Sequence, residues 1–275
     1  MARTKKQEEA TMNVESTEVV VKQDTALQHV SVGNIEGFEN VDLSKDIKYP
    51  RVKLMQKMSP ELDENEALRA GMMVNSVTLE QVPQTFIPLL ISKSNIFFVP
   101  RDADKWQPIL QAIPTINKED FDGELAICRA MDAKTGDRFG NCVTCPYSKF
   151  QGKNAPLCTE TINVMVLLEG DFLPSIISFS VTSLKHGKNF INLALMKSMK
   201  EGALFASKYK WTAKKNSNAK GDWFELTVQP IADKPTEDEL FMAREMYNMV
   251  KDYVVSVDAI VDEQVAPVAD TNSEY

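Results

Sequence analysis

Regular alternation of apolar and polar residues predicts strands along the middle of the chain. The segments TINVMVLLE (161–169) and SIISFSVT (175–182) carry apolar side chains at every second position, as a strand with one buried face does. Shorter strand patterns occur at GMMVNSVTLE, TFIPLLI and NIFFVP, which are bounded by Pro83, Pro88 and Pro100. A polar NSNAKG turn separates ALFASKYKWTAKK from DWFELTVQP, and this arrangement predicts a β-hairpin.

Helical spacing of apolar residues appears at three places. Residues 106–113 form a short amphipathic pattern, and residues 183–202 form a longer one that begins with Ser183 as N-cap. The last pattern begins after Pro235, where Thr236 and Glu239 match a capping box, and it continues through LFMAREMYNMVKDYVVSV. The core-facing positions predicted for the second helix are Leu184, Phe190, Ile191, Ala194, Leu195 and Met199.

Together these elements predict a mainly β or α+β domain. Five or six strands, with one helix between strands and one at the end, fit a small barrel of the oligonucleotide-binding (OB) type with an inserted zinc-binding loop. A β-sandwich remains an alternative. The predicted organisation is a disordered N-terminal arm (1–46), an OB-like core (47–232) with the insertion at 128–158, a C-terminal helix (233–257) and an acidic disordered tail (258–275).

Composition is that of a globular protein, with 43% apolar and 25% charged residues. The opening MARTKKQEEATM has no apolar segment of a signal peptide, and no apolar run approaches the ~20 residues that a membrane helix needs. We therefore expect a cytoplasmic protein with no membrane partner. The net charge of -8 argues against a protein that coats duplex DNA by bulk attraction, although it leaves the local distribution of charge open.

All four cysteines lie within ICRAMDAKTGDRFGNCVTCPYSKFQGKNAPLCT (127–159). Thirteen residues separate Cys128 from Cys142, two separate Cys142 from Cys145, and twelve separate Cys145 from Cys158. Two residues between thiolates allow a turn to direct both sulfurs at one ion at ~2.3 Å, and the flanking cysteines can complete a tetrahedral set. We therefore predict a structural zinc site with four cysteine ligands, in a segment too polar to bury a core of its own.

Other interpretations of the cysteines remain open, namely an iron–sulfur cluster or thiols that bind nothing. Disulfides are disfavoured by the cytoplasmic character of the chain. A redox C-x-x-C motif usually stands at the start of a helix after a strand, whereas Pro146 and Tyr147 continue here into another polar loop.

Positive charge and aromatic residues gather between Val181 and Glu225. This stretch holds nine lysines against three acids, a local net charge of +6 in an acidic chain. Lysines interleaved with aromatic rings are typical of a groove that binds phosphates and stacks bases. The predicted nucleic-acid-binding residues are Lys185, Lys188, Lys208, Tyr209, Lys210, Trp211, Lys214, Lys215, Lys220 and Trp223.

Strand alternation sorts this set by face. In the first strand of the predicted hairpin, the lysines at 208, 210 and 214 share one face, and the aromatic residues share the opposite face, which we expect to be the core side. In the second strand, Trp223 points toward the lysine-bearing face and is the main stacking candidate. Tyr209 and Trp211 are either core residues or further stacking residues. Lysines that only make this face soluble are the alternative.

The two ends of the chain carry opposite charge. Residues 258–275 contain five acids and no base, a composition suited to competing with phosphates or binding partner proteins, although a plain disordered tail is equally compatible with it. The basic cluster of Arg3, Lys5 and Lys6 could pair with the acidic part of a neighbouring molecule, so self-association remains open.

No enzymatic motif is apparent. The chain has two histidines, His29 and His186, and neither lies in a recognisable metal or triad context. Neither a phosphate-binding G-x-x-x-x-G-K-[ST] loop nor a dinucleotide-binding G-x-G-x-x-G motif occurs. Paired aspartates at 102/104 and 120/122 lie in polar loops, as solvated charges do. We expect a binding protein without catalytic residues.

The layout resembles the single-stranded DNA-binding proteins of tailed bacteriophages, in particular the zinc-containing kind. The resemblance rests on the basic arm, the interrupted core and the acidic tail, and on the segments PRVKLMQKMSPEL, GMMVNSVTLE, CRAMD, NCVTCPYSKFQGKNAPLC and ISFSVTSLK. It implies the four cysteines as metal ligands and an acidic tail that recruits polymerase or helicase partners. One departure is clear, because the zinc-containing phage proteins use a histidine among their ligands.

The sequence thus predicts a protein that binds single-stranded DNA without base preference during phage DNA replication, recombination or repair, in the cytoplasm of a bacterial host. Its partners would be single-stranded DNA and, through the tail, replication or recombination proteins. Two functions of other classes remain open: a zinc-ribbon regulator that binds a polymerase or another protein, and a metal-dependent nuclease.

Overall fold

The structure, a computed structural model, describes residues 48–100, 106–150, 152, 155–218 and 221–252. All of them belong to the second of two compact units of the chain, Asp42–Tyr275. The predicted N-terminal arm, the predicted acidic tail and Lys220 lie outside the described residues.

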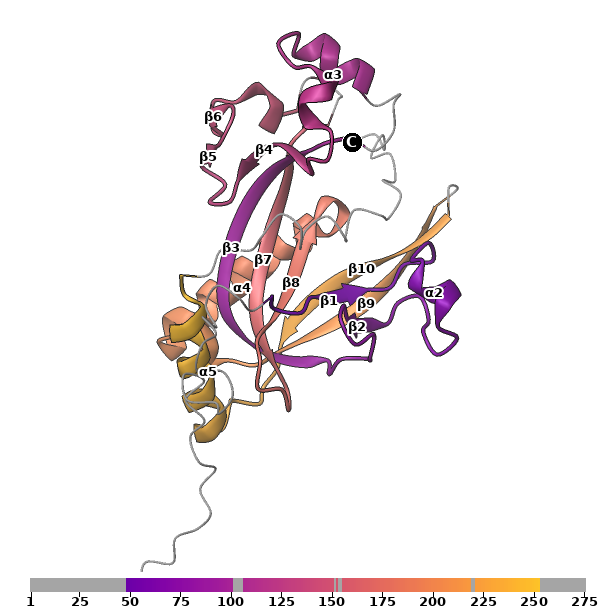
Figure 1. Cartoon of the computed structure of the whole chain (residues 1–275). Coiled ribbons are helices and arrows are strands. Elements are labelled where there is room, and N and C mark those ends of the chain that lie inside the picture. The colour runs from indigo at the N-terminus through magenta and orange to yellow at the C-terminus, as the bar shows by residue number, and fades with distance from the viewer. Residues whose placement is uncertain (1–47, 101–105, 151, 153–154, 219–220, 253–275) are drawn as a thin grey trace, which may run out of the picture. The chain divides into compact units, whose positions relative to one another are not determined.

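An antiparallel six-stranded sheet forms the centre of the described part of the chain (Figure 1). Its strands follow the order β10-β9-β3-β7-β8, and β4 pairs with the far end of β3. These strands are β3 (Thr85–Phe98), β4 (Ala126–Ala130), β7 (Thr159–Leu168), β8 (Ser175–Ser180), β9 (Tyr209–Asn218) and β10 (Gly221–Pro230).

Strand β3 runs through the whole sheet as a single element. The sequence predicted two separate strands, TFIPLLI and NIFFVP, but the structure shows one strand of 14 residues. The register with β7 shifts between Pro88 and Leu90, so a bulge accommodates a residue that cannot donate a ladder hydrogen bond. β3 pairs with β9 at its start and with β4 at its end, and it thereby links two separate hydrophobic cores.

The main core lies between the sheet and helix α4 (Leu184–Glu201). Phe190 and Ala194 of the helix are buried against Phe86, Tyr209 and Trp211 of the sheet. The Phe86 and Trp211 rings stack with centroids 4.9 Å apart, and Phe190 meets Tyr209 edge to face. The helix therefore forms where the sequence predicts it.

Two of the six apolar positions predicted to face the core from α4 are exposed. Leu195 and Met199 have 59% and 79% of their surface accessible to solvent, because the sheet contacts a narrower stripe of the helix than the apolar pattern suggests. The buried stripe includes Gly187, which allows close approach. A Cβ atom at this position would lie 2.7 Å from the Cβ of Phe179.

The sheet does not close into a barrel. Within the described residues, β10 and β8 stand at the two ends of the strand order, β4 pairs with β3 alone, and the small sheet of β1 (Val52–Leu54) and β2 (Met73–Asn75) is separate. A single parallel bridge joins Arg51 to Ile176 of β8, and the Gln56 amide bonds both main-chain groups of Phe224 in β10. The mainly β prediction with additional helices is confirmed, whereas the predicted closed OB-type barrel is not.

The cysteines lie in a part of the chain that has a core of its own. We call residues 106–158 the cysteine module; it contains α3 (Trp106–Ala112), η3 (Lys118–Phe121), β4, β5 (Thr135–Gly136), β6 (Gly140–Asn141) and η4 (Pro146–Ser148). In Figure 1, α3, β4, β5 and β6 gather at one end of β3. Apolar residues from α3, η3 and β4 bury one another against Phe97 of β3. The buried residues of this core lie at positions 97–128, and the predicted insertion 128–158 adds Cys128 and the partly buried Phe139, Tyr147, Leu157 and Cys158.

The remaining elements complete the described chain. Helix α5 (Glu237–Val250) begins at the predicted capping box, because Thr236 Oγ1 accepts from the Glu239 N–H and the Glu239 carboxylate accepts from the Thr236 N–H. Short elements are α2 (Glu61–Glu64), η5 (Val181–Ser183) and η6 (Leu204–Ala206). None of the helices in the described ranges is long and apolar enough to cross a membrane.

Candidate functional site

One face of the β9–β10 hairpin carries polar and cationic side chains. The register pairs Lys210 with Gln229, Lys214 with Glu225, and Asn216 with Trp223, and alternation places each pair on the same side of the ribbon. We call this the hairpin polar face. Its eight residues are Lys210, Thr212, Lys214, Asn216, Trp223, Glu225, Thr227 and Gln229.

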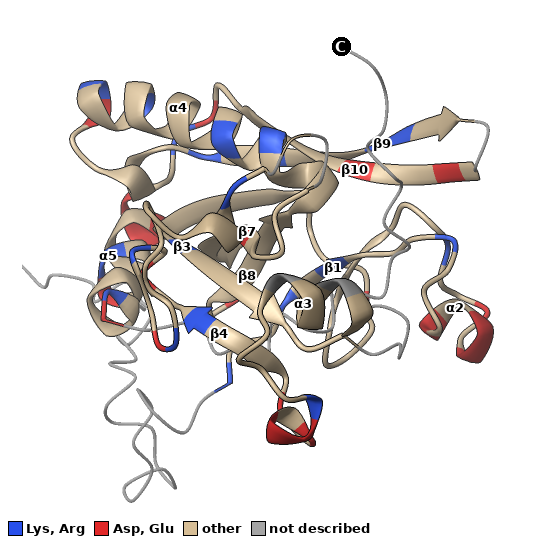
Figure 2. Cartoon of the chain, turned by 90° about the horizontal axis from the view of Figure 1, so that it is seen from above, with Lys and Arg blue, Asp and Glu red and all other residues tan. Residues whose placement is uncertain are grey.

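The predicted lysines separate into two groups. Lys210 and Lys214 are exposed on the hairpin polar face. Lys215 points to the other side of the strand, where its Nζ lies 3.0 Å from Asp222 Oδ2. On α4, Lys185 and Lys188 are at least half exposed and pair with Glu225 and Glu160. Figure 2 shows this basic character along α4 and β9.

Lys208 does not join the exposed lysines. It precedes β9, its side chain is only 11% exposed, and its Nζ lies 2.7 Å from Glu239 Oε1 in the first turn of α5. Phosphate binding by Lys208 stays a prediction that the structure does not favour, because the charge of Lys208 is already paired with an acid 31 residues away in the sequence. Strand alternation alone could not reveal that partner.

Two of the three predicted stacking residues belong to the core. Tyr209 and Trp211 are 0% and 1% exposed, so neither presents a ring face to a base, and their predicted binding role is corrected. Trp223 is half-buried on the polar face, and its indole N–H donates to Glu225 Oε1 at 3.3 Å. The accessible aromatic surface of this face is therefore that of Trp223.

Glu225 organises the centre of the hairpin polar face. Its carboxylate accepts from Lys185 Nζ at 3.1 Å and lies 2.8 Å from His186 Nε2, in addition to the Trp223 contact. Burial opposes its ionisation, but the hydrogen bonds from His186, Lys185 and Trp223 outweigh burial and lower the pKa of Glu225 to about 2. The carboxylate of Glu225 therefore joins β10 to the start of α4 through these contacts.

Sequence reasoning did not find this link. His186 was assigned no site, and Glu225 counted only as one of few acids in a basic stretch. The sequence carries no clear signal of this link, because alternation places Glu225 opposite Leu226, on the side expected to meet solvent, whereas the structure buries it. The partners stand 39 and 40 residues away, so only the fold identifies them.

The four cysteines lie in or next to the short strands and turns of the cysteine module. Cys128 lies in β4 opposite Phe97 of β3, and Thr159, next to Cys158, lies opposite Ile96. Cys142 directly follows β6, and Cys145 directly precedes η4. All four are in the described part of the chain and are free thiols, with Cys128 and Cys145 buried.

The four thiols are close enough for their charges to interact. Burial and the neighbouring Cys145, Cys128 and Cys142 raise the pKa of Cys158 to about 12. Burial also raises the pKa of Cys128, although main-chain N–H groups of Arg138 and Phe139 donate to it. Among the described side chains, no group of three or more His, Cys, Asp or Glu residues is already arranged to hold a metal ion.

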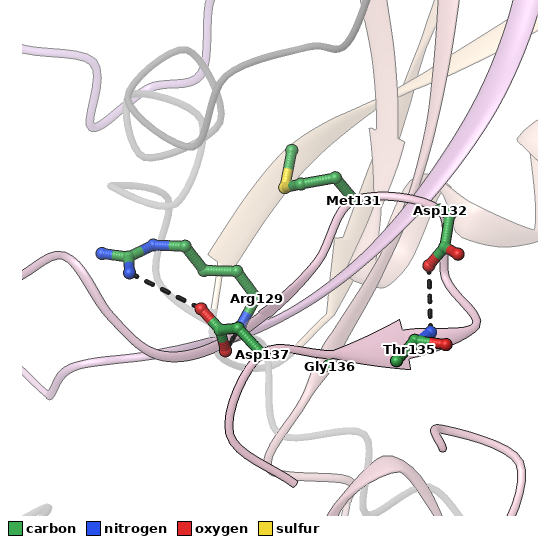
Figure 3. A pocket seen from close by; sticks show the side chains of 6 residues that line it. All are labelled: Arg129, Met131, Asp132, Thr135, Gly136 and Asp137. Carbon is green, nitrogen blue, oxygen red and sulfur yellow. Dashed lines mark hydrogen bonds and ion pairs between the residues drawn. The ribbon is translucent and has the colours of Figure 1, made fainter. Parts of the chain in front are cut away.

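A shallow, open pocket lies beside β4 and β5 (Figure 3). Asp137 accepts the Arg129 N–H at 2.8 Å, and the Arg129 guanidinium also pairs with Glu124. Asp132 accepts from the N–H groups of Lys134 and Thr135, and these bonds lower its pKa. These carboxylates therefore stabilise the turn between β4 and β5, and their role is structural.

Comparison with protein families shows which family this chain belongs to. A family model described as "Pam3 phage gp34-like protein" matches residues 15–256, most of the 275-residue chain. The chain belongs to this family. Its membership indicates a phage protein, which agrees with the phage part of the resemblance seen in the sequence. No curated protein and no solved structure matches this family member.

Proposed function

We propose that this phage protein binds single-stranded DNA without base preference, through the hairpin polar face. The observation that carries the proposal is the placement of exposed Lys210 and Lys214 on the same face as the accessible part of Trp223. Cationic side chains beside an aromatic ring are the combination that binds phosphates and stacks bases in sequence-independent single-strand binding.

The geometry of the face suits an extended strand. Lys210 and Lys214 are four residues apart on β9, which corresponds to roughly 13 Å along the ribbon. Lys185 reaches the same face from α4. Glu225 does not repel phosphates strongly from here, because Lys185 already pairs with its charge.

The arrangement of the sheet also favours this function. The β1–β2 segment lies between the free edges of β8 and β10 and touches both through Arg51 and Gln56. A curled sheet with its gap partly bridged is close to the partly open barrel of OB-type folds, which bind oligonucleotides. We propose a role in DNA replication, recombination or repair, with protein partners bound by the acidic residues 258–275, as the resemblance to phage single-strand-binding proteins implies.

The test is fluorescence anisotropy of labelled oligo(dT) titrated with the full-length protein, beside a duplex of equal length and at several salt concentrations. We expect tighter binding of the single strand, with an affinity that falls linearly in log salt because counterions are released. Lys210→Glu combined with Lys214→Glu should weaken binding and reduce the salt slope by about 2.

A matched control is Lys118→Glu combined with Lys134→Glu, two exposed lysines of the cysteine module. This control makes the same change in net charge and should keep the affinity near that of the wild type. Equal losses in both double variants would mean bulk attraction and would remove the hairpin polar face from the proposal. No binding at low salt by a folded wild-type protein would end the proposal.

A second function, binding of a protein partner through the cysteine module, is favoured by one observation. Val143 and Phe150 expose 69% and 70% of their surface in the segment between β6 and β7. Exposed apolar side chains mark a protein interface where they form a contiguous patch. Val143→Ser with Phe150→Ser would weaken capture of a polymerase under this function and leave oligo(dT) binding unchanged.

A further inference from the structure

The turn that contains Cys142 and Cys145 is held by hydrogen bonds to its main chain. The Ser148 hydroxyl lies 2.6 Å from the carbonyl oxygen of Cys142 and 2.9 Å from that of Cys145, and both contacts tighten the turn. On the other side, the Cys142 N–H donates to the Lys134 carbonyl at 2.8 Å. The main chain of both cysteines is therefore held at the end of the β5–β6 hairpin.

Cys128 reaches this turn from β4 and enters a cradle of main-chain atoms. The N–H groups of Arg138 and Phe139 donate to its sulfur, so main-chain donors of the β5–β6 hairpin fix the position of this side chain. A Cβ atom on Gly136 would lie 2.6 Å from the Cys128 Sγ, so the absence of a side chain at Gly136 makes room for the sulfur. The β5–β6 hairpin thus closes directly over this thiol.

Cys158 approaches from the start of β7. Its N–H donates to the Tyr147 carbonyl at 2.9 Å, and Tyr147 belongs to the η4 turn that follows Cys145. Cys158 and Cys128 are also part of the same apolar cluster. Separate hydrogen bonds therefore hold β4, the β5–β6 hairpin and the start of β7 near one another. Each of these three elements contains or adjoins a cysteine.

We propose that Cys128, Cys142, Cys145 and Cys158 bind one zinc ion as four thiolates, in a closed site that fastens the β5–β6 hairpin and η4 to the ends of β4 and β7. Four thiolates leave no coordination position for water, so the ion has a structural role. Because the described side chains are not arranged at coordination distances, the sulfurs close on the ion as it binds. The site is independent of the DNA-binding function proposed above.

The metal content of the full-length protein, purified without chelator, tests the site. We expect one zinc per chain by mass spectrometry of the metal. Cobalt(II) in place of zinc should give the ligand-field and sulfur-to-metal charge-transfer absorption of a tetrahedral four-thiolate site. This spectrum is obtained on the wild-type protein, so it does not depend on the folding of any variant.

The test compares two variants. One is the double variant Cys142→Ser with Cys145→Ser, and the other is the control Val143→Ser, which changes an exposed residue of the same turn. The cysteine variant should lose the bound zinc, and Val143→Ser should keep it. Chelation of the wild-type metal should lower the melting temperature of the cysteine module. The proposal is overturned by a wild-type protein without stoichiometric metal or a four-thiolate cobalt spectrum, by iron with inorganic sulfide, or by equal zinc loss in both variants.

Discussion

Glu225 Oε2 of β10 lies 2.8 Å from His186 Nε2 in the first turn of α4, so an edge strand and the helix that covers the main core meet at a buried carboxylate. Lys185 Nζ lies 3.1 Å from the other carboxylate oxygen, so each oxygen of Glu225 has a partner on α4. The link places the start of α4 beside the hairpin polar face. Its loss should therefore affect folding stability and the proposed binding face together.

Glu225→Gln should make the protein less stable at neutral pH and less sensitive to acid. The pKa of Glu225 in the folded state is about 2, below the ordinary 4.5, so its ionised form is favoured by folding. The stabilisation is complete above about pH 4.5 and is lost as the pH falls toward 2. Urea unfolding of both proteins at several pH values should show the difference between them shrinking over this range.

Glu160→Gln is the control for that experiment. Glu160 also receives two lysines, with Lys188 Nζ at 2.9 Å and Lys93 Nζ at 3.6 Å, but its side chain is 32% exposed. Exposed ion pairs contribute ~1 kcal/mol or less, so the control should change the free energy of unfolding only slightly. A difference between wild type and Glu225→Gln that stays constant from pH 6 to pH 2 would contradict the assigned role of Glu225.

Gly187→Ala should destabilise the protein although alanine is the better helix former. An exposed helical glycine replaced by alanine gains up to ~1 kcal/mol. At this position the new Cβ would lie 2.7 Å from the Cβ of Phe179, an atom that no rotamer change can move. We expect a net loss of roughly 1–3 kcal/mol from overpacking, measured by thermal unfolding. Asn192→Ala, exposed on the same helix, should be neutral or stabilising.

Lys208→Glu should lower stability instead of acting only on DNA binding. The substitution places a second carboxylate against Glu239, on a side chain that is 11% exposed. Partial burial puts the expected cost between that of an exposed pair, ~1 kcal/mol, and that of a buried one, ~3 kcal/mol. The measurement is the melting temperature, and Lys210→Glu is the comparison. Equal melting temperatures for the two variants would show that the ion pair contributes nothing.

Trp223→Ala should weaken oligo(dT) binding by roughly 10- to 100-fold, the loss expected for one base stacked on an aromatic ring at ~1–3 kcal/mol. Trp223→Phe keeps a ring and loses only the hydrogen bond to Glu225, so it should bind nearly as well as the wild type. Anisotropy titrations at one salt concentration measure both variants. Wild-type affinity in Trp223→Ala, or an equal loss in Trp223→Phe, would exclude stacking on this ring.

The local elements were predictable because their signals are local. The α5 capping box, the β9–β10 hairpin and the strand alternation of β7 and β8 each depend on residues a few positions apart, and all appear in the structure. Partners distant in sequence were not predictable. The Lys208–Glu239 pair, the burial of Tyr209 and Trp211 and the exposure of Met199 depend on which elements pack together.

The sequence by itself determined the strands and helices, the clustering of all four cysteines in one segment and the basic character of residues 181–225. Only the tertiary structure decided that the sheet stays open, that Lys208 pairs with Glu239, and that Glu225 is buried beside His186. The physical reason is that periodicity records which side of an element is apolar, whereas accessibility and charge pairing depend on what packs against that side.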